Sequence, residues 1–156
     1  MAQEILVKDV LDDKMIEAGA DLTRRLDEAG VAPSASLWLY VPELNIWRLM
    51  IASPLVKSQG PRKVYRKIQS LLTGPTGGES LIPLPSITVV ENNHPLISAL
   101  RSAVATRKPI CGIRFSRNTI RGHFVEDAYI YRMKERHPAE PKTRVHRKPT
   151  PSHRHR

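Results

Sequence analysis

The fold of this chain is decided by residues 36–53, which read SLWLYVPELNIWRLMIAS. Two runs rich in aromatic and aliphatic side chains flank Pro42–Asn45, a four-residue segment that is typical of a hairpin turn. A hairpin with this turn pairs Tyr40 with Trp47. Side chains alternate along a strand, so both faces of this hairpin are apolar, and we expect it at the centre of a sheet.

Three other segments have the apolar spacing of three and four residues that is typical of an amphipathic helix. The first covers residues 8–30, the second begins at Pro61, and the third follows Asn93. A short strand is expected at 87–90, between the second and third helices.

A second hairpin is expected over residues 109–133. A four-residue loop at 117–120 would place Arg114 opposite His123. The same register would put Phe124 on the apolar face. The other face of this hairpin would be polar and would carry Arg114, Ser116, Arg121, His123, Asp127 and Tyr129.

The predicted element order is therefore αββαβαββ over residues 1–133. This order favours an α+β domain of two layers, in which three helices pack on one face of a mostly antiparallel five-stranded sheet. The chain length suits one such domain with its own core.

The last segment, residues 134–156, differs sharply from the rest in composition. It contains eight Lys and Arg residues against two Glu, and so contributes +6 of the chain's formal net charge of +10. Ala139 and Val145 are its only aliphatic residues, so burial cannot offset the entropy cost of ordering it. We expect a disordered polycationic arm.

Positive charge in the remaining 133 residues falls into two blocks that contain no acid, Lys57–Lys67 and Arg101–Arg121. Clusters of this kind attract phosphates. We therefore expect a non-enzymatic basic module that binds nucleic acid or a nucleoprotein assembly, with the arm adding electrostatic affinity. None of the common nucleic-acid-binding motifs is present in the sequence. The expected contacts are Arg62, Lys63, Arg66, Lys67, Arg114, Arg117 and Arg121.

An alternative function is a small metal-independent hydrolase or phosphodiester-processing enzyme that uses the polar face of the second hairpin. His123 would be the general base, Asp127 would orient it, and Arg114 would hold an anionic group beside Tyr129. His123 and Asp127 are four positions apart, about 13 Å along a regular strand, so direct contact between them is not expected. The sequence favours a binding protein over an enzyme.

A second alternative is a protein–protein adaptor in a larger complex, with the hydrophobic hairpin faces contacting a protein partner or a second copy of the chain. The aromatic face of Trp38, Tyr40 and Trp47 is expected in the core, and its alternative is an exposed stacking platform for nucleic acid.

No metal or cofactor site is expected. The acids of the first helix and Glu91 lack supporting ligands, and the glycines at 74–78 lack the lysine of a phosphate-binding loop. Cys111 is the single cysteine, which excludes a disulfide framework and favours a cytoplasmic protein. No segment approaches the roughly 18 apolar residues of a membrane span.

Overall fold

The computed structural model describes residues 9–72 and 82–135 of the chain. The predicted arm lies, from residue 136 onward, outside these described residues. The elements are α1 (Asp13–Glu28), β1 (Ala35–Val41), β2 (Ile46–Ala52), α2 (Leu55–Gln59), α3 (Pro61–Leu72), the 3-10 turn η1 (Leu84–Ser86), β3 (Ile87–Val90), α4 (Pro95–Ala103), β4 (Ile113–Ile120) and β5 (His123–Met133). The predicted order is confirmed with one addition, the helix α2. Its five residues are too few to show a helical period in the sequence.

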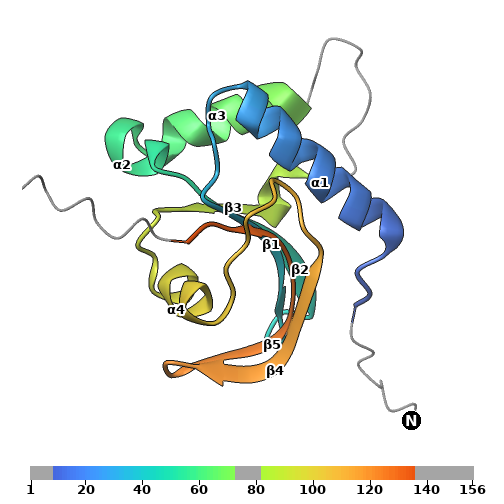
Figure 1. Cartoon of the computed structure of the whole chain (residues 1–156). Helices are drawn as coiled ribbons and strands as arrows, with labels where there is room; N and C mark the ends of the chain where they lie inside the picture. Colours follow the sequence, from blue (N-terminus) through green and yellow to red (C-terminus); the bar gives the residue numbers. More distant parts are fainter. Residues whose placement is uncertain (1–8, 73–81, 136–156) are drawn as a thin grey trace, which may run out of the picture.

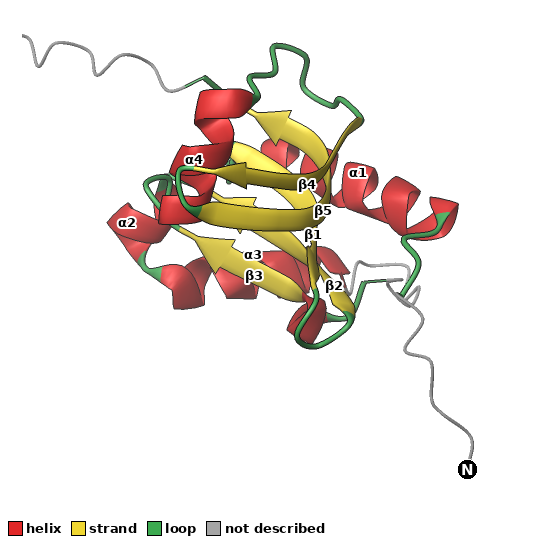
Figure 2. Cartoon of the chain, turned by 90° about the horizontal axis from the view of Figure 1, so that it is seen from below, coloured by secondary structure: helices red, strands yellow, loops and turns green. Residues whose placement is uncertain are grey.

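The five strands form one sheet in the order β3-β2-β1-β5-β4. All neighbouring pairs are antiparallel except β2 and β3, which are parallel. The mostly antiparallel sheet is thus confirmed. The parallel pair follows from its connection, because the chain returns through α2 and α3 before it enters β3 (Figure 2).

The first hairpin has the predicted register, with Tyr40 opposite Trp47 and Trp38 opposite Leu49. Trp38 and Trp47 are only 1% and 4% exposed, so the aromatic face is part of the core. The alternative of an exposed stacking platform is therefore wrong. Both faces of the hairpin are buried within the chain itself.

The two longer helices form a layer on the outer face of the sheet, and α4 packs against its inner face (Figure 1). The tryptophans of the first hairpin share the outer cluster with Val64 and Ile68 of α3. The inner cluster joins Ile97 and Leu100 of α4 to the sheet. The expectation that all three helices pack on one face is therefore wrong, because the central hairpin is apolar on both sides and α4 covers its second face.

The second hairpin differs from its predicted register. Arg114 lies opposite Tyr129, and His123 lies opposite Ile120 across a turn of two residues, Arg121 and Gly122. Both turn residues have positive φ angles, 47° and 83°, as a two-residue type I′ turn requires. The predicted pairing of Arg114 with His123 is wrong because this tight turn replaces the expected four-residue loop.

The side chains of the second hairpin also change faces halfway along it. The pairing is interrupted between Arg117 and Glu126, and Arg117 has a φ of 47°. Beyond this point Val125 is buried in the inner cluster, whereas Phe124 is 60% exposed. The predicted apolar position of Phe124 is therefore wrong.

The described body extends to Glu135, two residues beyond the predicted domain boundary. The backbone N–H of Lys134 donates to the carbonyl of Ser34 at 2.9 Å, and its carbonyl accepts from Arg101 at 2.8 Å. Lys134 therefore belongs to the described body, directly after β5. Within the described residues, no helix combines the length and apolarity needed to cross a bilayer.

Candidate nucleic-acid interface

Four of the five basic residues of the first block lie together on the outward side of α3, and the fifth, Lys57, lies on α2. Val64 and Ile68 face the sheet and are fully buried, so the positions on the opposite side of the helix point away from the core. Arg62, Lys63 and Arg66 are exposed there, and Lys67 is half-buried. We call these four residues the α3 basic face. No acid occurs anywhere from residue 55 to residue 72, so this element carries no compensating negative charge.

The basic residues of the second hairpin do not extend this surface. Figure 1 shows the β4–β5 hairpin at the opposite end of the molecule from α3. Arg117 lies 4.0 Å from Glu126, and Arg121 occupies the turn. The seven predicted contacts therefore form two separate groups.

Arg114 is engaged in a structural pair. Its guanidinium donates two hydrogen bonds to the carboxylate of Asp127, at 2.6 and 2.7 Å, and lies 5.5 Å from the ring centre of Trp47. The bonds to Asp127 raise the pKa of Arg114. The side chain of Asp127 is only 6% exposed, so this pair joins β4 to β5 on the outer face of the sheet.

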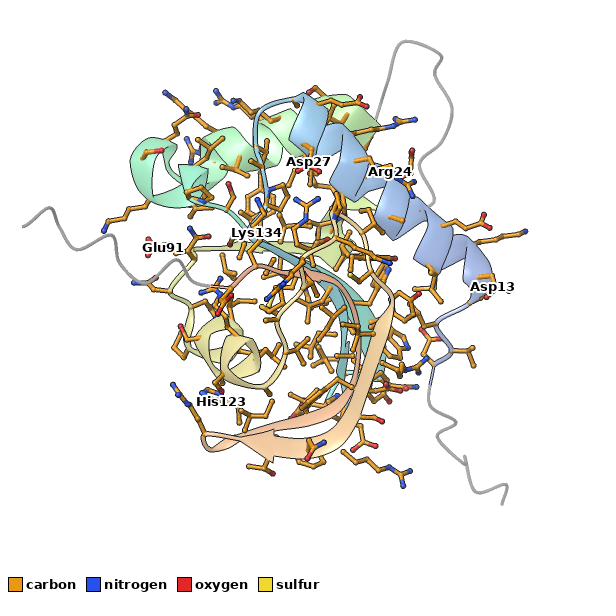
Figure 3. All side chains as sticks on the ribbon, in the orientation of Figure 1. Asp13, Arg24, Asp27, Glu91, His123 and Lys134 are labelled. Carbon is orange, nitrogen blue, oxygen red and sulfur yellow. The ribbon has the colours of Figure 1, made fainter. Side chains whose placement is uncertain are left out.

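The structure brings together only part of the predicted catalytic set. Arg114, Asp127 and Tyr129 share the outer face, where Tyr129 packs against Tyr131 with ring centres 5.4 Å apart. His123 is at the turn end of β5 and shares its face with Val125, on the inner side (Figure 3). The change of faces at Arg117 thus separates the histidine from the carboxylate that was to orient it.

A pocket that the sequence did not reveal lies where three strands end. β2, β3 and β5 run in the same direction, and their last residues meet at one edge of the sheet. Ligand sites are common at the carboxyl ends of parallel strands. A cavity of about 460 Å³ opens here, and we call it the strand-end pocket. Its lining residues are Ser34, Pro54, Lys57, Glu91, Asn92, Asn93, Arg101, Lys134 and Glu135.

Hydrogen bonds between the surrounding segments hold the pocket wall in place. Arg101 of α4 donates to the carbonyl oxygens of Lys134, at 2.8 Å, and Asn92, at 3.2 Å. Ser34 donates to the side-chain oxygen of Asn92 at 2.5 Å. These bonds join the ends of β3 and β5 to the start of β1, so the pocket is preformed.

The strand-end pocket is lined by a residue of α2, the helix that precedes α3, and by the two residues that precede the arm. Lys57 of α2 lines the pocket, and only Gly60 separates α2 from α3. Lys134 and Glu135 line it as well, and the polycationic segment follows them directly in the sequence. Figure 3 shows Glu91 and Lys134 on this side of the molecule.

Comparisons with known proteins identify no relative: no family model, curated protein or solved structure matches this chain. Within residues 9–72 and 82–135, no group of three or more His, Cys, Asp or Glu side chains is placed to hold a metal ion.

Proposed function

We propose that this protein binds nucleic acid, alone or within a nucleoprotein assembly, through the α3 basic face and the C-terminal basic arm. The observation that carries the proposal is the α3 basic face itself, which presents four cations on a helix without acids. Such a surface attracts the phosphate backbone and releases its counterions.

The arm adds affinity to the same surface. Residues 136–156 contain seven Lys and Arg residues and one Glu. They directly follow Lys134 and Glu135, which line the strand-end pocket together with Lys57 of α2. A strand held by α3 is therefore within reach of the arm. Binding by two linked elements is stronger than binding by either alone, since the second contact is intramolecular.

The second hairpin has no part in this proposal as a phosphate-binding surface. Arg114 is already paired with the buried carboxylate of Asp127. We propose a binding protein of the cytoplasm, and the proposed location rests on the lone Cys111.

The proposal is tested by measuring the affinity of the full chain and of a chain ending at Glu135 for fluorescent oligonucleotides over a range of salt concentrations. The full chain is expected to bind at low salt, with an affinity that falls steeply as salt rises. The shortened chain is expected to bind more weakly, with the log–log slope reduced by about 0.9 for each duplex phosphate that the arm no longer neutralises. Binding that is absent at low salt, or that does not depend on salt, would contradict the proposal.

A further inference from the structure

We propose that the strand-end pocket binds one nucleoside monophosphate unit of a nucleic-acid strand, with the phosphate against Lys57 and Lys134 and the base edge against Glu91 and Asn93. This inference rests on the proposed function, because the strand that enters the pocket is the one held by α3 and the arm. It adds a substrate class, since a base can enter the pocket only when it is unpaired.

The dimensions and position of the pocket suit a single nucleotide. Its volume of about 460 Å³ lies within the usual range of small-molecule sites, roughly 300–1,000 Å³. Lys57 stands on the side that leads to α3, so a backbone that follows the α3 basic face reaches the pocket at this residue.

The charges of the pocket select a ligand with two kinds of polar group. Lys57 and Lys134 supply positive charge for a phosphate. Within the described chain, neither lysine nor Glu91 forms an ion pair within 4.0 Å, so these groups are not committed to one another.

Glu91 and Glu135 argue against a site for a simple anion, because two carboxylates repel a bare phosphate. A carboxylate accepts hydrogen bonds from the amino group of a base, as Glu does from cytosine. The amide of Asn93 can both donate to a base and accept from it. The pocket therefore fits a phosphate joined to a base with an exocyclic amino group, and it disfavours uracil and thymine.

The preformed wall favours binding without rearrangement. Arg101 donates hydrogen bonds to the backbone carbonyl oxygens of Asn92, at 3.2 Å, and Lys134, at 2.8 Å, and so holds both residues in place. Duplexes engage their base edges in pairing, so entry would require a base to leave the stack. We infer that single strands rich in cytosine are preferred over duplexes.

The test uses the full chain and two variants that remove the same charge, Glu91→Gln in the pocket and Glu43→Gln in the exposed β1–β2 turn. Calorimetric titrations with CMP, UMP and inorganic phosphate measure the pocket directly. Oligodeoxycytidylate, oligodeoxythymidylate and a duplex measure its effect on nucleic acid. CMP should bind more tightly than UMP, and UMP more tightly than phosphate.

Glu91→Gln should weaken the binding of CMP and oligodeoxycytidylate about fivefold, because the glutamine amide still accepts the hydrogen bond but lacks the charge that about doubles its strength. It should leave duplex binding unchanged or slightly stronger, because a negative charge is removed. Glu43→Gln should not lower the affinity for any of these ligands. The sign of the effect on cytidine ligands thus separates recognition of the base from general electrostatics.

If Glu91→Gln strengthens the binding of all ligands to the same extent as Glu43→Gln, the pocket proposal is wrong and the proposed function stands. If oligonucleotides fail to bind at low salt while CMP binds in the expected order, the pocket is a site for a free nucleotide, and both the binding of a strand in the pocket and the proposed function are wrong. If neither CMP nor any oligonucleotide binds, both are wrong.

Discussion

Arg132 on β5 donates two hydrogen bonds to the carboxylate of Asp27 on α1, at 2.6 and 2.8 Å. The Arg132 side chain is only 3% exposed, and it also donates to the carbonyl oxygens of Pro33, at 3.0 Å, and Pro109, at 2.9 Å. One buried cation thus joins α1 to β5 and to the loops that precede β1 and β4. The hydrogen bonds from Arg132 lower the pKa of Asp27 although desolvation opposes the shift.

Asp27→Asn is expected to lower the free energy of unfolding at pH 7 by about 2 kcal/mol, since it weakens hydrogen bonds to a buried charge. Because the folded-state pKa of Asp27 is lowered, its contribution is present above the ordinary carboxyl pKa of about 3.9. The contribution disappears as the pH falls through the folded-state value. Urea unfolding at several pH values should therefore show the variant and the original chain converging in acid.

The control for this variant is Glu17→Gln, which removes an exposed acid from the same helix. It should change the free energy of unfolding by no more than about 0.5 kcal/mol at any of these pH values. If Asp27→Asn and Glu17→Gln behaved alike, the Asp27–Arg132 pair would not stabilise the contact between α1 and β5.

Gly19→Ala is expected to destabilise the protein by about 2 kcal/mol. A β-carbon at this position would lie 2.8 Å from the indole nitrogen of Trp38 and closer still to the hydroxyl of Tyr131. These two groups are hydrogen-bonded to each other at 2.9 Å, and Tyr131 donates to the carbonyl of Ile16 at 2.5 Å. Helix propensity alone would make the same substitution stabilising by up to about 1 kcal/mol. The sign of the change in the urea midpoint decides between the two effects.

The Arg114–Asp127 pair should show a coupling free energy of about 1–3 kcal/mol in a double-mutant cycle. Arg114→Ala alone leaves a carboxylate that is 6% exposed without the guanidinium that bonds both of its oxygens. Removing both side chains should cost less than the sum of the single substitutions. Strictly additive effects in chemical unfolding would show that the pair contributes nothing to the attachment of β4.

The first hairpin could be predicted in register because local signals agree there. The turn Pro42–Asn45 and the alternation of apolar residues both require Tyr40 opposite Trp47. The register of the second hairpin could not be predicted, because its turn places the backbone of Arg121 in the left-handed region. Arginine rarely marks a turn of this kind. The irregularity at Arg117 is likewise invisible to simple alternation, which therefore places Phe124 on the wrong face.

The strand-end pocket was beyond prediction for a different reason. Its residues come from separate segments that meet only because β2, β3 and β5 run in one direction, and the sequence does not specify strand order or direction. The polar run Glu91–Asn93 directly after a strand was the one local signal of it. The α3 basic face, in contrast, could be predicted, since helical spacing separates its cations from Val64 and Ile68.

The role of α3 as the nucleic-acid surface is tested most directly by a charge-matched comparison. Lys63→Ala/Arg66→Ala removes two exposed charges from α3, and Lys14→Ala/Arg24→Ala removes two exposed charges from α1 (Figure 3 labels Arg24). Both variants should keep the fold, because all four side chains are exposed.

The measurement is the slope of log affinity against log salt for a duplex, by fluorescence anisotropy. The α3 variant should bind more weakly, and its slope should fall by about 1.8, at about 0.9 for each of two phosphates that are no longer neutralised. The α1 variant should keep the original slope. Equal reductions in the two variants would show that only net charge matters, and would contradict the assignment of the surface to α3.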